Sequence, residues 1–195
     1  MFAASNQLLW SMIGLLLTIG GTFLEAHSIT FPWSWSQHGI QTVSLGVSYQ
    51  IGAVLLIGCL GGQNAGALSQ IAYLVMGLAL HPVFDEGGGI GYIKLSQFGY
   101  LLGFIPGAWI CGFVAFQTRP KLETLTFSCI CGLLTIHLCG IIYLIVSHAF
   151  QGQGTDNPLL TQAILKYSWF AIPSQLAIVC AVTVVAYLLR HLMFY

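Results

Sequence analysis

Long apolar runs separated by short polar stretches dominate this chain of 195 residues. A helix that crosses a bilayer needs about 20 predominantly apolar residues, because each residue adds about 1.5 Å along the helix axis. We expect membrane spans at residues 7–24, 43–62, 65–81, 97–117, 125–149 and 173–192. The pattern therefore predicts an all-α integral membrane protein, a single domain over residues 1–195 built as one six-helix bundle.

The connections between these spans alternate in length. Residues 25–42, 82–96 and 150–172 form long segments rich in Gly, Pro, Trp or His, whereas the other two connections are short. The long loops must then share one face of the membrane, with both termini on the other face. Long loops on a small bundle are typical of proteins that bind or gate something.

The few cations indicate the orientation. Arg119, Lys121 and Arg190 lie on the side of the termini, whereas Lys94 and Lys166 lie with the long loops. Cytoplasmic segments carry an excess of Lys and Arg, so this distribution places the termini in the cytoplasm and the long loops outside.

The last long loop allows two interpretations. Residues 159–167 place apolar side chains on one helical face beside Lys166, as in an interfacial helix, and Pro173 would then open the last span. Alternatively, a single kinked helix runs from residue 162 to residue 192.

Composition supports a lipid-facing surface and excludes one class of partner. Charged residues make up 5% of the chain and hydrophobic residues 57%, against about 25% charged residues in soluble domains. The formal net charge is zero, which leaves no basic patch for a phosphate backbone. We expect a lipid bilayer around the chain and no nucleic acid partner.

Small residues recur every four positions in three of the spans. Such stripes allow close helix approach, either inside the bundle or, most plausibly for the first span, against a partner membrane protein. The stripes comprise residues 58, 62 and 66, residues 99, 103 and 107, and residues 14, 18 and 22.

An enzyme is the rival class. His81, Asp85 and Glu86 could act as metal ligands or as an acid/base group beside a membrane cavity. Their spacing fits no zinc signature, and the chain has no Gly-x-Ser-x-Gly or His-Glu-x-x-His motif. His137, within the fifth span, has no obvious partner in the sequence. We therefore expect no catalytic residue, no metal and no cofactor.

The six cysteines lie in or near the predicted spans. No C-x-x-C pair occurs, and none of the cysteines lies in a long loop where a disulfide would form. We expect all six to be small apolar packing residues: Cys59, Cys111, Cys129, Cys131, Cys139 and Cys180.

The stretch from Ser48 to Phe113 combines several specific motifs. Gly62 and Gly66 open the third span, Pro-Val-Phe at residues 82–84 precedes a run of glycines, and Gly-Tyr-Leu-Leu-Gly-Phe occupies residues 99–104. In this combination the chain resembles the BioY family of biotin transporters, the substrate-binding S components of energy-coupling factor (ECF) transporters. The resemblance implies high-affinity capture and uptake of biotin rather than catalysis.

The resemblance also implies a fold, a location and partners. Members have six helices, cytoplasmic termini and a vitamin site under the outer loops, in the bacterial plasma (inner) membrane. This chain has no Walker motif, so it cannot hydrolyse ATP itself. The implied partners are a transmembrane coupling subunit and two ATPase subunits. Two alternatives to biotin uptake remain. The chain could be an S component for a different small vitamin-like ligand, or a non-transporting membrane scaffold protein.

Two polar groups of biotin need partners in a buried site. The ureido group needs an amide or carboxylate, and the carboxylate tail needs a cation, because an unpaired buried charge costs several kcal/mol. Gln175 stands where the family usually has an acidic residue, and its amide both donates and accepts. Lys94 or Lys166 could bind the carboxylate, although each could instead extend toward the lipid headgroups.

Other side chains near the long loops complete the predicted site. Gln97 lies in the segment that replaces the family's usual Gly-Pro-Thr-Gly turn. Trp33 could wall the ligand ring or belong to the aromatic belt at the interface, and Gln50 could contact the ligand or join two helices. The remaining candidates are Tyr100 and Asp85.

Overall fold

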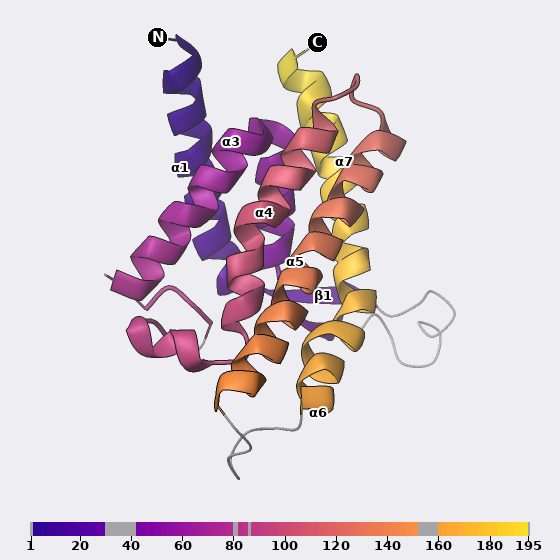
Figure 1. Ribbon diagram of the computed structural model, residues 1–195. Helices are drawn as coiled ribbons and strands as arrows, with labels where there is room; N and C mark the ends of the chain where they lie inside the picture. Colours follow the sequence, from indigo (N-terminus) through magenta and orange to yellow (C-terminus); the bar gives the residue numbers. More distant parts are fainter. Residues whose placement is uncertain (1, 30–41, 80–81, 86, 152–159, 195) are drawn as a thin grey trace, which may run out of the picture.

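The computed structural model describes residues 2–29, 42–79, 82–85, 87–151 and 160–194. Long helices lie side by side, and both termini lie at the same end of the molecule (Figure 1). In chain order the elements are α1 (Phe2–Thr22), β1 (Glu25–Ile29), β2 (Thr42–Ser48), α3 (Gln50–Ala79), η2 (Ile90–Lys94), α4 (Phe98–Ala115), α5 (Leu122–Gln151), α6 (Leu160–Ile164), η3 (Leu165–Trp169) and α7 (Ile172–Phe194).

Helix α3 is a hairpin with two arms, residues 50–61 and 63–79, joined at Gly62. Gly62 has φ 80° and ψ 179°, a backbone conformation that residues with a Cβ rarely adopt. A methyl group at Gly66 would lie 3.4 Å from the Cα atom of Gly58, although eight residues of continuous helix would separate the two by about 12 Å. The second and third predicted spans are therefore separate helical arms.

Most of the predicted spans correspond to helices. Within the described residues, four helical stretches are long and apolar enough to cross a membrane, namely α3, α4, residues 122–149 of α5 and residues 160–193. The first predicted span coincides with α1, which packs against α3, since a methyl group at Gly14 would lie 2.6 Å from Ile57. The chain is thus a mostly helical membrane protein.

The expectation of an all-α fold was wrong between the first two spans. Strands β1 and β2 pair in antiparallel fashion, with Glu25 opposite Ser48 and Ile29 opposite Thr42. The predicted span 43–62 therefore starts too early, because its first residues form β2. The sequence TVSLGVS alternates in polarity and is rich in β-branched residues, both of which favour a strand.

The C-terminal helical region favours the kinked-helix interpretation. After α6, residues 165–169 form a π-helical turn, and a bend at residues 170–171 leads into α7. Pro173 lies in the first turn of α7, where its missing N–H group costs nothing. Single π turns inside helices are frequent at functional sites, and this one carries Lys166 and Ser168.

The glycine stripes face the interior of the bundle. A methyl group at Gly58 would lie 3.0 Å from the Ala108 carbonyl oxygen, and one at Gly103 would lie 2.8 Å from the Ile136 carbonyl oxygen. In the first span, Thr18 is fully buried and accepts a hydrogen bond from Gln70 Nε2 at 3.0 Å. These stripes, including the one in the first span, serve internal packing.

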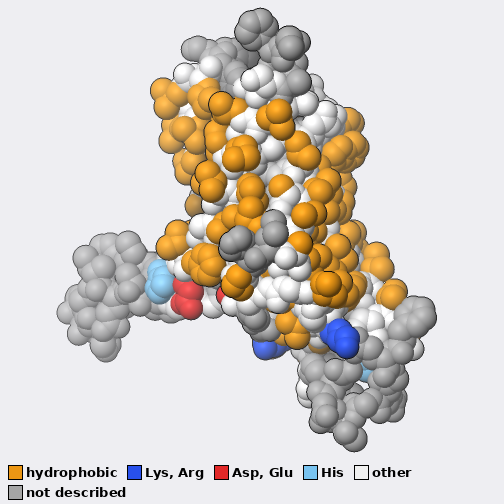
Figure 2. Space-filling model, turned by 90° about the vertical axis from the view of Figure 1, so that its left-hand side faces the viewer, with side chains coloured by type: hydrophobic (Ala, Val, Ile, Leu, Met, Phe, Trp, Pro, Cys, Tyr) orange, Lys and Arg blue, Asp and Glu red, His pale blue; other side chains and the backbone are white. Residues whose placement is uncertain are grey.

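The outer surface suits lipid. Figure 2 shows hydrophobic side chains along most of one face, while charged side chains gather near the end opposite the termini. Large apolar residues such as Leu16, Leu138 and Leu192 are more than half exposed. A hydrocarbon environment accounts for this exposure, because water would penalise it.

Candidate functional site

A cavity of about 440 Å³ lies at the end of the bundle opposite the termini. Its walls come from β2, the first turn of α3, η2, α4, η3 and the start of α7. The lining residues are Gly46, Val47, Ser48, Gln50, Ile51, Asp85, Tyr92, Gln97, Tyr100, Leu101, Phe104, Lys166, Tyr167, Ala171 and Gln175. Small-molecule sites typically measure about 300–1,000 Å³ and combine apolar walls with a few polar groups.

The structure brings most of the predicted site residues together. Lys94 is exposed at the end of η2 and does not line the cavity. Trp33 lies outside the described residues, as do His81 and Glu86. The predicted residues that line the cavity are Gln50, Asp85, Gln97, Tyr100, Lys166 and Gln175.

A chain of hydrogen bonds runs behind the cavity wall from α4 to α7. Tyr100 Oη lies 2.7 Å from Ser168 Oγ, and Ser168 Oγ lies 3.2 Å from His137 Nδ1. His137 Nε2 lies 2.6 Å from Gln175 Oε1. Because an amide oxygen only accepts, His137 Nε2 carries the proton, and in a neutral ring Nδ1 accepts the Ser168 hydroxyl.

These hydrogen bonds determine which atom of the Gln175 amide is left for a ligand in the cavity. Its Oε1 atom is engaged by His137, whereas its Nε2 atom has no hydrogen-bond partner among the described residues. The Gln175 side chain is only 5% exposed and lines the cavity, so its amide is a buried donor at the wall of the space that a ligand would fill. A donor in that place suits a carbonyl oxygen.

A second polar cluster centres on Tyr73 in the second arm of α3. Gln50 Nε2 donates to Tyr73 Oη at 2.8 Å, and the Tyr73 hydroxyl donates to the Val83 carbonyl at 3.0 Å. Thr22 Oγ1 lies 3.2 Å from the same hydroxyl. Gln50 thus joins the two arms of α3, as one sequence interpretation held, and it also lines the cavity.

The described residues after α3, 82–85 and 87–89, pack against the helices beside the cavity. The Phe84 ring is buried between Tyr73 and Tyr92, with ring centroids 5.3 and 4.6 Å away. A methyl group at Gly77 would lie 2.1 Å from that ring, so only glycine leaves room for it. Gly89 N donates to the Gly77 carbonyl at 2.8 Å. The packing of Phe84 positions the next residue, Asp85, at the cavity wall.

Charge in the cavity lining is sparse. Among the described lining residues, Lys166 is the one cation and Asp85 the one acid. Lys166 Nζ lies 5.1 Å from the centroid of the Tyr167 ring, and Tyr167 lies 6.0 Å from Tyr100. The cavity thus offers an aromatic wall, a buried amide donor and a cation at its edge.

His137 and Ser168 are the site residues that the sequence analysis missed. His137 looked isolated because its partners lie 31 and 38 residues further along the chain. One signal was present: an ionisable residue within a membrane span is costly unless it has a partner, so it usually marks a site.

The fold and the cavity define a helical membrane protein with a cavity of small-molecule size at one end. The chain belongs to the BioY family, whose profile matches residues 5–194. This confirms the resemblance, and it places the chain in a transporter family rather than among enzymes.

Individual proteins are similar to the chain in sequence or in fold. The chain is 25% identical over 186 residues, 95% of each chain, to the "Uncharacterized 21.2 kDa protein in psbX-ycf33 intergenic region" of Cyanophora paradoxa. It is 38% identical over 99 residues, half of each chain, to the "Probable biotin transporter BioY" of Lysinibacillus sphaericus. The S-component for biotin from an ECF-type ABC transporter matches in fold with a TM-score of 0.70 at 20% identity, over 96% of this chain and 92% of that one.

Proposed function

We propose that this chain captures biotin in the cavity and serves as the S component of an ECF-type transporter. The observation that carries the proposal is the buried Gln175 amide, whose oxygen is held by His137 at 2.6 Å while its N–H donors are left for a ligand. The ureido carbonyl of biotin is an acceptor that matches this donor.

The rest of the ligand finds suitable surroundings in the same cavity. Tyr100, Phe104 and Tyr167 supply an apolar wall for the bicyclic ring. Lys166 lies at the cavity edge and would pair with the carboxylate tail, whereas Lys94 lies outside the lining. Asp85, Gln97 and Gln50 would contribute the remaining polar contacts.

The proposed topology has six crossings with both termini in the cytoplasm. These crossings are α1, the two arms of α3, α4, α5 and α7. The cavity end then faces the outside of a bacterial plasma (inner) membrane, where the ligand is collected. Because the sequence has no Walker motif, energy for uptake would come from a coupling subunit and two ATPase subunits.

Calorimetric titration of biotin into the purified protein in detergent tests the proposal. We expect saturable binding of one biotin per chain. Absence of binding by protein that elutes as a single folded species would contradict biotin capture and favour a different vitamin-like ligand or the scaffold role.

If Lys166 pairs with the carboxylate of biotin, its replacement should weaken the binding of biotin but not of biotinamide, which has no carboxylate. Wild-type protein should bind biotin about two- to fivefold more tightly than biotinamide, since an ion pair at an exposed lysine contributes up to about 1 kcal/mol. Lys166→Gln should remove this preference and leave biotinamide binding unchanged.

Lys94→Gln is the matched control, because Lys94 is a second exposed lysine at the same end of the bundle. It should keep the preference for biotin. Loss of the preference in Lys94→Gln but not in Lys166→Gln would assign the carboxylate to Lys94 instead.

A further inference from the structure

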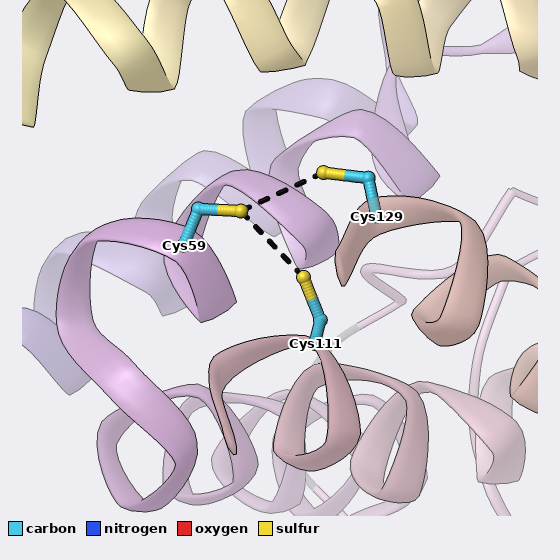
Figure 3. Close-up of side chains that lie close together, drawn as sticks. All are labelled: Cys59, Cys111 and Cys129. Carbon is cyan, nitrogen blue, oxygen red and sulfur yellow. Dashed lines mark hydrogen bonds between the residues drawn. The ribbon is translucent and has the colours of Figure 1, made fainter. Parts of the chain in front are cut away.

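Three cysteines from three helices meet in the interior of the bundle, away from the cavity that holds Gln175. Cys59 lies in the first arm of α3, Cys111 in α4 and Cys129 in α5, and their sulfur atoms point toward one another (Figure 3). Cys59 Sγ lies 3.6 Å from Cys111 Sγ and 3.5 Å from Cys129 Sγ. All three residues are fully buried.

The sulfur triangle has the dimensions of a metal site. Two sides measure 3.6 and 3.5 Å and the third does not exceed 4.8 Å. The point equidistant from the three sulfurs therefore lies at most about 2.4 Å from each, close to the ~2.3 Å of a zinc–thiolate bond. An ion could occupy that point without rearrangement of the three helices.

We propose that Cys59, Cys111 and Cys129 bind a soft monovalent cation of the Cu(I) class. Within the described residues, no fourth Cys, His, Asp or Glu belongs to this group. Structural zinc sites need four ligands in tetrahedral arrangement, whereas this group supplies three, and soft thiolate ligands also select Cu(I).

Charge around the cluster is compatible with bound thiolates. A thiol that binds as a thiolate releases its proton, so one Cu(I) with two thiolates and one thiol carries a net single negative charge. The buried Arg190 guanidinium interacts electrostatically with Cys59. Arg190 Nη1 donates to the Ala115 carbonyl at 2.8 Å, which fixes the compensating charge in place.

A second cavity is lined by residues that lie close to two of the cluster cysteines in the sequence. It measures about 380 Å³, and its lining includes Gly61, Gln63, Asn64 and Gly112. Gly112 follows Cys111 directly in the sequence, and Gly61 lies two residues after Cys59. Gly62, the residue at the turn between the two arms of α3, also lines this cavity.

Anaerobic titration of the reduced full-length protein with Cu(I) tests the site, with a chromophoric Cu(I) chelator as competitor. We expect the wild type to retain an equimolar amount of Cu(I). Cys59→Ser, Cys111→Ser and Cys129→Ser should each lower this retention at least about tenfold. Cys139→Ser and Cys180→Ser are the matched controls outside the cluster, and they should retain the wild-type amount.

X-ray absorption at the copper edge provides a measurement on the unaltered protein, so the test does not depend on the folding of a variant. We expect three sulfur neighbours at about 2.3 Å. Retention no greater than in the cluster variants, equal losses in the Cys139→Ser and Cys180→Ser controls, or fewer than three sulfur neighbours would each overturn the proposal. None of these readouts requires biotin binding.

Discussion

Replacing Gly112 by alanine is expected to destabilise the protein strongly. The added Cβ would lie 2.4 Å from Gln63 N and 2.5 Å from Gly62 C. These are backbone atoms at the turn of the α3 hairpin, so no side chain can rotate to make room. Overpacking of a core typically costs 1–3 kcal/mol, and we expect about 3 kcal/mol here, roughly a 6–12 °C loss in thermal midpoint for a chain of this size.

The thermal midpoint can be followed in detergent with a thiol-reactive fluorophore, because the buried cysteines become reactive only when the bundle opens. Gly20→Ala is the control. Gly20 also lies in a helix, but a methyl group there meets no atom within 4 Å. Since alanine is the better helix former, Gly20→Ala should leave the midpoint unchanged or raise it slightly. Equal midpoints for the two variants would show that the α3 turn adapts to the extra methyl group.

The membrane helices could be predicted because hydrophobic length is a property of each segment by itself. The runs 97–117 and 125–149 correspond closely to α4 and α5. The α3 hairpin was also predictable, since the apolar runs 43–62 and 65–81, each of near-span length, left only Gln63 and Asn64 between them. A bilayer imposes a similar length on every helix that crosses it, so membrane-spanning helices are easy to recognise in a sequence.

Strand β2 was missed because its residues are apolar enough to extend a neighbouring helix. Thr42–Ser48 leads directly into Gln50, and a short apolar run does not distinguish a strand from a buried helix end. What decides the strand is its pairing with Glu25–Ile29, which residues 30–41 separate from it in the sequence. A local pattern carries no information about such a partner.

The candidate site was predicted in composition but not in connectivity. Gln175, Tyr100 and Lys166 were chosen for their chemistry and position near the long loops, and they line one cavity. His137 and Ser168 join two of them into one hydrogen-bond chain. Finding that chain requires knowing which faces of α4, α5 and η3 meet. The cluster of Cys59, Cys111 and Cys129 could not be predicted either, because it also depends on which helix faces pack together.

The hydrogen-bond chain predicts a large loss of biotin binding when Gln175 is replaced by leucine. The substitution removes the buried donor and leaves His137 Nε2–H without its acceptor. The ureido oxygen of bound biotin would then be buried without this donor, which costs about 1–3 kcal/mol, so calorimetry should show binding weakened about 10- to 100-fold. His137→Leu should have a smaller effect in the same direction, because the Gln175 amide remains present but is no longer oriented.

An analogue distinguishes a specific hydrogen bond from general damage to the cavity. In 2-iminobiotin an imino nitrogen, protonated at neutral pH, replaces the ureido oxygen and would place a donor against the Gln175 donor. Wild-type protein should therefore prefer biotin about tenfold or more, and Gln175→Leu should lose most of that preference. Gln162→Leu, the same substitution at an exposed glutamine outside this cavity, should keep both affinity and preference. If Gln175→Leu weakened both ligands equally and left the preference intact, the ureido oxygen would have to bind elsewhere in the cavity, and Gln175 would serve only to support its wall.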